Sequence, residues 1–182
     1  MNFKSSKYGF TIIELLVVIF IVGVLSSLLF ADFRSGKKRY ELSQAAQKLA
    51  SDIRNAQGKA MGGIKSGSFD FCAYCVRASQ ASPNSYIFYM DSSSSSCDHN
   101  YAPSNDEIIK TINLTENVEI RSTQKNGSSV SSLNVCFEPP KPKTFINNDS
   151  TSDARGKIIL GIKNSSDIEV IDINSVGLVE ID

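Results

Sequence analysis

The chain has 182 residues, of which 41% are hydrophobic and 21% are charged, as in an ordinary folded protein. This length suits one globular domain with an attached element. Its 19 basic and 19 acidic side chains cancel, so bulk charge gives no general attraction to nucleic acids or to anionic surfaces. Only a local cluster of charge could supply one.

A long apolar run follows a short basic leader. From Phe10 to Ala31 there are 22 residues, and Glu14 is the only charged one. A helix of this length covers roughly 33 Å, slightly more than the roughly 30 Å hydrocarbon core of a bilayer. Because a cleaved secretory signal has a shorter apolar region of about 7–15 residues, the run predicts a membrane-spanning helix over residues 10–31.

Glu14 requires an explanation, because a carboxylate at the centre of a spanning helix costs about 2.5–3.5 kcal/mol on insertion scales and less near its end. One interpretation is that the side chain only reaches toward the membrane interface. The interpretation we favour is a positive partner at the same depth. Cleavage after Gly9 would expose the amine of Phe10, and the carboxylate of one helix can meet the amine of a staggered parallel neighbour. Glu14 would then set the register between subunits.

The stretch KYGFTIIELLVVI, from Lys7, resembles the class III signal of type IV prepilins and type II secretion pseudopilins. The resemblance rests on the short basic leader, Gly9, Phe10 and Glu14. It implies cleavage after Gly9 by a prepilin peptidase and N-methylation of Phe10. It also implies that Glu14 serves the assembly of a helical filament with other pilin or pseudopilin subunits.

The charges on either side of the apolar run bear on orientation. Two lysines precede the run and four basic residues follow it, between Arg34 and Arg39. By the positive-inside rule, this count alone would keep the residues after the run in the cytoplasm, which is opposite to the orientation that export requires. The cysteines and the Ser/Asn-rich remainder of the chain argue the other way. We expect a single-pass protein of the inner membrane, with its leader inside and its globular part outside the cytoplasm, that later joins a filament.

A helical pattern continues after the run. Apolar residues recur at spacings of 4, 3, 4, 3 and 4 and predict one buried stripe: Leu42, Ala46, Leu49, Ile53, Ala56 and Ala60. Polar residues such as Lys48 and Asp52 occupy the other faces. Gly62 and Gly63 then end the helix, so we expect an amphipathic half over residues 32–62.

The remainder, residues 63–182, reads as short strands separated by turns. The expected strands are SFDFCAYCVR from Ser68, SYIFYMD, EIIKTINL, NVEIRST, SSLNVCFE, GKIILGIKN, DIEVIDIN and VGLVEI. Asn126-Gly127 is one of the turns between them.

The sequence thus predicts an α+β fold, in which a long N-terminal helix packs on a β-rich globular domain. The expected division is a leader over 1–9, a transmembrane half-helix over 10–31, the amphipathic half over 32–62 and the globular domain.

Two further stretches resemble the GspH/FimT-like minor pseudopilins. They are the helix segment LASDIRNAQGKAM and the closing strands of IKNSSDIEVIDINSVGLVEID. This narrower resemblance implies a minor subunit that decorates or caps a filament. Major pilins, which typically show one meander and a tail disulfide loop, stay open as an alternative.

The four cysteines all follow the apolar run, and an even number in an exported chain favours disulfides. Cys72 and Cys75, in CAYC, have the spacing of a redox motif. Residues three apart in a strand point to opposite faces, however, whereas a redox pair needs both sulfurs together at a helix start. We therefore expect structural half-cystines with different partners, Cys97 and Cys136. Free thiols, a four-cysteine zinc site and redox catalysis are the alternatives.

No catalytic, metal or cofactor site is expected. His99, the only histidine, follows a serine run in a polar loop, and we expect it to be exposed to solvent rather than part of a Ser/His/Asp site. The basic cluster Gly36–Arg39 is expected to be a solvated helix face or to contact lipid headgroups. Because phosphate binding needs clustered Lys/Arg and the C-terminal end is acidic, nucleic acid is not an expected partner.

The expected function is that of a minor pilin or pseudopilin. Such a chain is a structural subunit of a type IV filament-like machine, a type II secretion pseudopilus or a type IV pilus, and is not an enzyme. Two alternatives stay open, a DNA-binding minor pilin for DNA uptake and a membrane-anchored envelope enzyme. Secretion, pilus and competence machines are equally compatible with the sequence.

Overall fold

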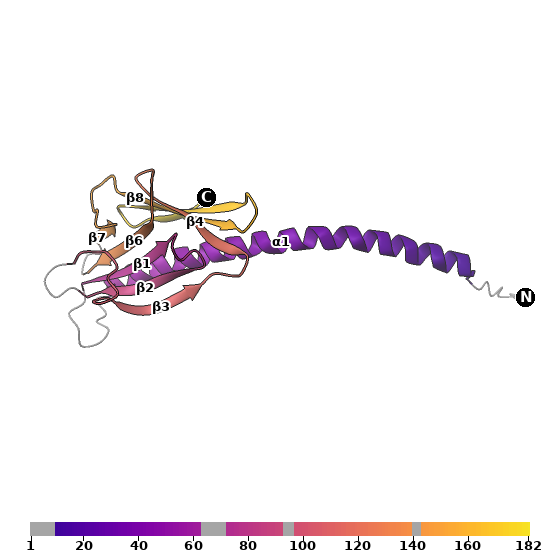
Figure 1. Cartoon of the computed structure of the whole chain (residues 1–182), viewed down its shortest axis with the longest axis horizontal. Helices are drawn as coiled ribbons and strands as arrows, with labels where there is room; N and C mark the ends of the chain where they lie inside the picture. Colours follow the sequence, from indigo (N-terminus) through magenta and orange to yellow (C-terminus); the bar gives the residue numbers. More distant parts are fainter. Residues whose placement is uncertain (1–9, 63–71, 93–96, 140–142) are drawn as a thin grey trace, which may run out of the picture. The chain divides into compact units, whose positions relative to one another are not determined.

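The computed structural model describes four stretches of the chain, with the backbone alone for residues 28–35. These stretches are residues 10–62, 72–92, 97–139 and 143–182 (Figure 1). The chain divides at Lys37 into two units, and each is described by itself below.

Helix α1 runs from Ile12 to Met61. No proline occurs in this stretch, so nothing in the sequence removes a helical hydrogen bond. The N–H of Gly62 donates to the carbonyl oxygen of Gly58 at 3.0 Å, and the helix ends there, next to the predicted glycine pair. Gly63 lies outside the described residues. Within the described residues, no helix has both the length and the apolar character needed to cross a membrane.

Two antiparallel sheets follow the helix in the described part of the chain (Figure 1). The first sheet has the order β3-β2-β1-β6-β7 and contains β1 (Ala73–Ser79), β2 (Ser85–Asp91), β3 (Glu107–Asn113), β6 (Ser132–Glu138) and β7 (Lys143–Ile146). The second sheet has the order β10-β9-β8-β4-β5 and contains β4 (Val118–Lys125), β5 (Ser128–Val130), β8 (Arg155–Ile162), β9 (Ile168–Asn174) and β10 (Val179–Ile181). The β-rich character of the globular part is therefore confirmed.

All eight predicted segments contain a strand, and two short strands, β5 and β7, were not predicted. The residues 68–71 of the first predicted segment lie outside the described residues. Strand β5 is the return arm of a hairpin in which Lys125 pairs with Ser128. Its two turn residues, Asn126 and Gly127, have φ angles of 50° and 81°, as the expected Asn-Gly hairpin turn requires. The turn prediction is confirmed, and the same signal could have located β5.

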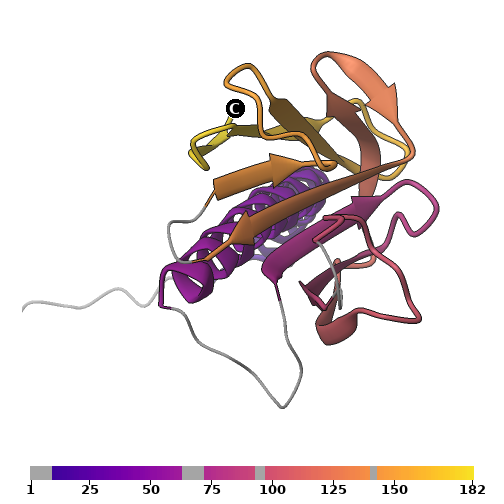
Figure 2. The same ribbon diagram turned by 90° about the vertical axis from the view of Figure 1, so that its left-hand side faces the viewer.

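One hydrophobic core joins the second half of α1 to both sheets. All six residues of the predicted stripe are buried: Leu42, Ala46, Leu49, Ile53, Ala56 and Ala60. Tyr74 and Leu133 come from the first sheet and Leu160 and Ile171 from the second, and all four are fully buried in the same cluster. Figure 2 shows this end of the helix lying between strands of the two sheets. The amphipathic pattern therefore identified the packed face of the helix correctly.

Asp52, which the pattern placed on a helix face other than the stripe, is itself buried. The hydroxyl of Tyr86 on β2 donates a 2.7 Å hydrogen bond to Asp52 Oδ2, and Lys48 Nζ lies 2.7 Å from Oδ1. A buried carboxylate is tolerated where such partners satisfy it. The sequence pattern could not show this, because Tyr86 is 34 residues away along the chain.

The first sheet is covered on its other face as well. Alternation along β1 directs Tyr74 and Val76 into the main core and Ala73 and Cys75 to the opposite face. On that face lies a smaller group of buried residues, which we call the outer cluster: Ala73, Cys75, Tyr89, Cys136 and Phe145. Tyr101, in the loop 97–106, packs against it, so this loop covers the outer face of the sheet.

Candidate functional site

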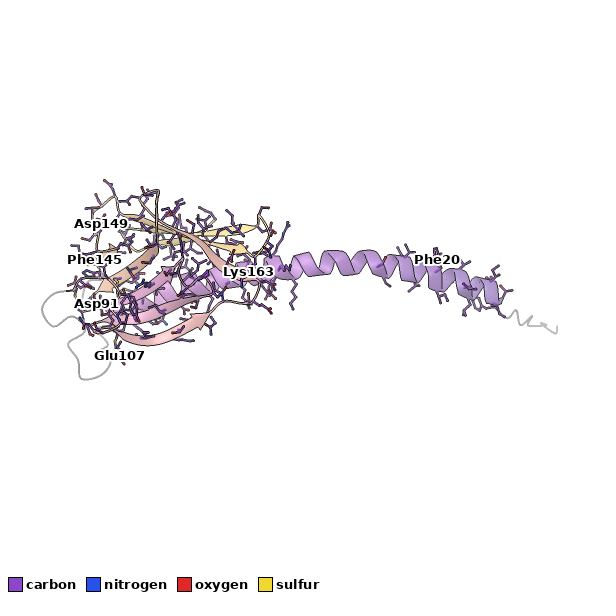
Figure 3. All side chains as sticks on the ribbon, viewed as in Figure 1. Phe20, Asp91, Glu107, Phe145, Asp149 and Lys163 are labelled. Atoms are coloured by element: carbon purple, nitrogen blue, oxygen red, sulfur yellow. A yellow bond between two sulfur atoms is a disulfide. The ribbon has the colours of Figure 1, made fainter. Side chains whose placement is uncertain are left out.

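The first turns of α1 expose their apolar side chains. Phe10 is 88% exposed and Ile12 is 84% exposed. Phe20, labelled in Figure 3, is 69% exposed. Soluble monomers rarely display a continuous apolar surface of this kind, and such surfaces commonly mark sites of contact with another protein or with a membrane. The side chains at positions 28–31, the end of the predicted span, are outside the described part.

Glu14 lies in the middle of one apolar face of this helix. Phe10, Ile13, Val17 and Val18 share that face with it, at the spacing of successive helical turns, and the five residues line a hollow of about 330 Å³. Gly9, the predicted cleavage position, lies outside the described residues. Phe10, the residue that would become the new N-terminus, is the first described residue. The geometry thus places one carboxylate in an otherwise apolar, exposed face.

Thr11 holds the carboxylate of Glu14. The backbone N–H and the side-chain hydroxyl of Thr11 donate to Glu14 Oε2 at 3.0 and 2.9 Å, and the N–H of Glu14 donates to Thr11 Oγ1 at 3.3 Å. This reciprocal arrangement is a capping box, which satisfies backbone donors that the first turn of a helix leaves free. The sequence analysis missed this role of Thr11, although the T-x-x-E spacing at the start of an apolar run is its signal.

The four cysteines form two disulfides, and Cys72 and Cys75 have different partners, as predicted. Cys75 pairs with Cys136 across the neighbouring strands β1 and β6, with a Cα–Cα distance of 4.1 Å, and both are fully buried in the outer cluster. Cys72, just before β1, pairs with Cys97 in the loop 97–106, with a Cα–Cα distance of 5.8 Å. The disulfides therefore fasten β6 and the loop to the start of β1.

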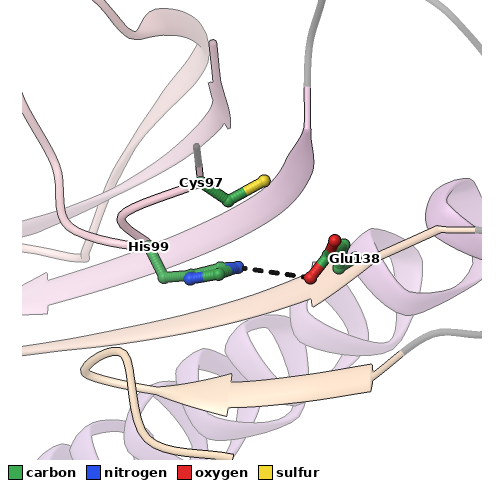
Figure 4. A group of neighbouring side chains, drawn as sticks. All are labelled: Cys97, His99 and Glu138. Atoms are coloured by element: carbon green, nitrogen blue, oxygen red, sulfur yellow. Dashed lines mark ion pairs between the residues drawn. The ribbon is translucent and has the colours of Figure 1, made fainter. Parts of the chain in front are cut away.

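The prediction for His99 was wrong, because this residue is 4% exposed. Its backbone N–H donates to Asp91 Oδ2 at 2.9 Å, and its ring stacks on Phe145 with a centroid distance of 3.6 Å and an interplanar angle of 10°. Its Nδ1 lies 3.0 Å from Asn148 Oδ1, and its Nε2 lies 3.7 Å from Glu138 Oε2 (Figure 4). The composition of the loop predicted exposure, but the loop folds onto the outer cluster and buries the ring.

Asp98 and Asp106 of this loop lie close enough to Asp91 of β2 for their charges to interact. Burial raises the pKa of Asp91, the N–H of His99 lowers it, and the neighbouring charges of Asp106 and Asp98 raise it further. Burial likewise raises the pKa of Asp106, although its oxygens accept backbone hydrogen bonds. Asp91 Oδ1 has no hydrogen-bond partner among the described residues. The end of the first sheet is therefore an acidic, partly desolvated region.

The basic cluster Gly36–Arg39 is partly neutralised within the second unit. Arg39 Nη2 lies 3.4 Å from Asp167 Oδ1, although the arginine side chain is 71% exposed. An exposed ion pair of this kind contributes little stability. It nevertheless leaves one basic residue of the cluster facing an acidic side chain, which does not favour phosphate binding.

The first unit matches one known family model. Residues 4–30 match the prokaryotic N-terminal methylation motif. This match supports a type IV pilin-like prepilin, and the motif implies processing by a prepilin peptidase and assembly with other pilins. A comparison with curated proteins finds no match. A comparison with solved structures finds none either.

Proposed function

We propose that this chain is a minor pilin or pseudopilin, a structural subunit that enters a type IV filament-like machine through its N-terminal helix. The observation that carries the proposal is the exposed apolar face around Glu14. This face falls within residues 4–30, the segment that matches the methylation motif. An apolar helix face with one central charge suits a contact that must be both extensive and in a defined register.

The same residues serve two stages in this proposal. Residues 10–31 hold the precursor in the inner membrane, with the β-rich part outside the cytoplasm, until the leader is cleaved after Gly9. The apolar side chains then pack against the helices of neighbouring subunits. Glu14 exchanges its hydrogen bonds from Thr11 for the amine of Phe10 on a neighbour, because a pair of opposite charges in an apolar contact attracts more strongly than a carboxylate and neutral donors.

The β-rich part faces outward and decorates or caps the filament. One observation supports the GspH/FimT-like subtype: the closing strands β9 and β10 lie in the segment whose sequence resembles those proteins. The chain acts mechanically in this proposal, with its apolar stripe and the Cys75–Cys136 disulfide holding the β-rich part together.

The Glu14→Gln variant tests the proposed register function. Glutamine retains an oxygen that can accept the Thr11 hydrogen bonds, but it lacks the charge that the neighbour's amine requires. We expect normal leader cleavage and at least a tenfold loss of incorporation into sheared filaments of the host, since about 1.4 kcal/mol per contact corresponds to a factor of ten. Thr11→Val is the matched control, because it removes one capping hydroxyl and leaves the charge. Unchanged incorporation of Glu14→Gln would refute this function for the carboxylate.

The N-terminal peptide of the protein from its own host tests the processing step. We expect a mature chain that begins with N-methylated Phe10, identified from the intact mass and from the N-terminal peptide. A chain that still begins at Met1 would mean that the leader is not cleaved and that the apolar run serves only as a membrane anchor. That result would also reopen the alternative of a membrane-anchored envelope enzyme.

A further inference from the structure

Three side chains with metal-binding groups converge where the loop 97–106 crosses the end of β6. Cys97 Sγ, a ring nitrogen of His99 and a carboxylate oxygen of Glu138 all lie within 4.8 Å of one another, and Figure 4 shows the three side chains. The His99 Nε2 to Glu138 Oε2 distance is 3.7 Å. A histidine nitrogen and a carboxylate oxygen on one tetrahedral zinc ion are roughly 3.3–3.5 Å apart, given metal–ligand distances of about 2.0–2.2 Å. The pair would therefore need to approach by only a few tenths of an ångström to share a zinc ion.

The His99 ring is oriented as a metal ligand would be. Asn148 Oδ1 can only accept a hydrogen bond, so Nδ1, at 3.0 Å, carries a proton, and in the neutral ring Nε2 then carries the lone pair. Histidines that bind metals almost always donate their other ring N–H in this way, which fixes the tautomer and the ring plane. Stacking on Phe145 holds the plane as well.

The lone pair of Nε2 has no hydrogen-bond partner among the described residues, although the side chain is 4% exposed. When the ring is neutral, this lone pair faces the Glu138 carboxylate at 3.7 Å, which is an unfavourable contact, whereas a protonated ring would form an ion pair there. A buried polar atom without a partner is costly and calls for an explanation. A cation between Nε2 and Oε2 would resolve both the unsatisfied atom and the unfavourable contact.

The fourth ligand of the proposed site comes from the disulfide partner of Cys97. Cys72 is bonded to Cys97, so reduction frees a second thiol one S–S bond away from the group. Two thiolates, an imidazole and a carboxylate form a set of four that suits tetrahedral zinc, and thiolates favour zinc over magnesium or calcium. The sulfurs of the intact disulfide are neutral and cannot supply this charge.

We propose that the Cys72–Cys97 disulfide conceals a zinc site, and that its reduction allows Cys72, Cys97, His99 and Glu138 to bind one Zn²⁺. A dithiol donates two electrons and two protons to the disulfide, which becomes two thiols, while the dithiol is oxidised to its own disulfide. Zn²⁺ then displaces the two thiol protons and binds both thiolates, His99 Nε2 and one carboxylate oxygen of Glu138. The disulfide and the metal are thus alternative cross-links of the same segments. This inference does not depend on the proposed function and departs from the expectation that the chain holds no metal.

Zinc and cobalt binding to the full-length chain in detergent tests the proposal. Mild reduction with a water-soluble phosphine under anaerobic conditions opens the disulfide, and thiol titration confirms two thiols per chain. A phosphine replaces the dithiol because dithiols compete for zinc. We expect one zinc per reduced chain by elemental mass spectrometry, and at least tenfold less in the oxidised chain. Co²⁺ in place of zinc should give a thiolate-to-cobalt charge-transfer absorption and intense tetrahedral bands.

Variants separate this site from other thiols and from misfolding. Glu138→Gln is nearly isosteric and changes a side chain that is 41% exposed, so the fold should tolerate it. We expect zinc binding to weaken at least about tenfold, because loss of groups that support a metal ion commonly has an effect of this size. His99→Gln should weaken binding similarly. The double variant Cys75→Ala/Cys136→Ala is the matched control and should keep the cobalt spectrum. The thermal unfolding of each oxidised variant reports its folding.

Two results would overturn the proposal. The first is a reduced chain that binds no more zinc than the oxidised chain. The second is a cobalt spectrum and zinc affinity that both Glu138→Gln and His99→Gln leave unchanged, because the thiolates would then bind the metal without these two residues.

Discussion

The hydroxyl of Tyr86 donates a 2.7 Å hydrogen bond to Asp52 Oδ2, and this bond connects α1 to β2 inside the core. Asp52 is 7% exposed and Tyr86 is 1% exposed. A buried carboxylate is stable only when hydrogen bonds replace its hydration, so each residue depends on the other for its place in the core.

Tyr86→Phe removes this hydrogen bond and leaves the rest of the ring in place. The Asp52 carboxylate would lose one of its partners in a desolvated site, so we expect the free energy of unfolding to fall by about 1–3 kcal/mol. Urea unfolding of the detergent-solubilised chain, followed by circular dichroism, measures the change. Tyr40→Phe is the matched control, because Tyr40 is 68% exposed and should shift stability little. Equal effects of the two variants would contradict the prediction.

The stability of the second unit should fall as the pH rises above about 10. Burial raises the pKa of Tyr74, Tyr86 and Tyr89 above the ordinary tyrosine value of 10.0, and the hydrogen bond to Asp52 raises that of Tyr86 further. Above that pH the unfolded chain releases these phenolic protons while the folded chain retains them. The unfolded state is then favoured, by up to about 1.4 kcal/mol per pH unit for each tyrosine.

Urea unfolding at pH 9, 10 and 11 measures this dependence. The Tyr86→Phe variant should show a shallower decline, since it lacks one of the three titrating groups. A free energy of unfolding that stays constant from pH 9 to pH 11, or an equal slope in the variant, would contradict the assignment.

Gly127→Ala and Gly58→Ala should change stability in opposite directions. Neither added methyl group would meet any atom within 4 Å, so the backbone conformation decides the sign. Gly127 has a φ of 81° in the hairpin turn, where alanine costs about 1–2 kcal/mol. Gly58 lies within α1, where alanine gains about 0.5–1 kcal/mol over glycine. Urea unfolding of the two variants measures both changes, and shifts of the same sign would contradict this reasoning.

Local periodicity accounts for the features that the sequence predicted well. The stripe from Leu42 to Ala60 and the eight strand segments each depend on residues a few positions apart, and so does the turn at Asn126-Gly127. The different partners of Cys72 and Cys75 were also predicted from local alternation, although Cys72 lies just before β1 rather than within the strand. These features need no knowledge of which distant segments meet.

The features that the sequence analysis missed depend on contacts between distant segments. His99 is buried because the loop that carries it packs on Phe145 and because Asn148, 49 residues further along, accepts its ring N–H. Glu138 joins the same group from the end of β6. A loop composition that is polar and rich in serine gives no indication of such partners. The group of Cys97, His99 and Glu138 therefore becomes visible only in the folded chain.

The two disulfides should differ in their resistance to reduction. Cys75 and Cys136 are fully buried between paired strands, whereas Cys72 and Cys97 are half-buried outside the strands. Because a reductant must reach the sulfur, we expect mild reduction without denaturant to open Cys72–Cys97 first and leave Cys75–Cys136 intact. Alkylation of the freed thiols with a mass tag, followed by peptide mapping, measures which cysteines react.

Reduction in denaturant is the control for this prediction and should free all four thiols, since unfolding removes the difference in burial. Equal labelling of the two pairs without denaturant would contradict the prediction. Selective labelling of Cys72 and Cys97 would mean that the zinc-binding thiols can form while the Cys75–Cys136 disulfide still holds β1 to β6. The loop could then exchange its disulfide for a metal without opening the outer cluster.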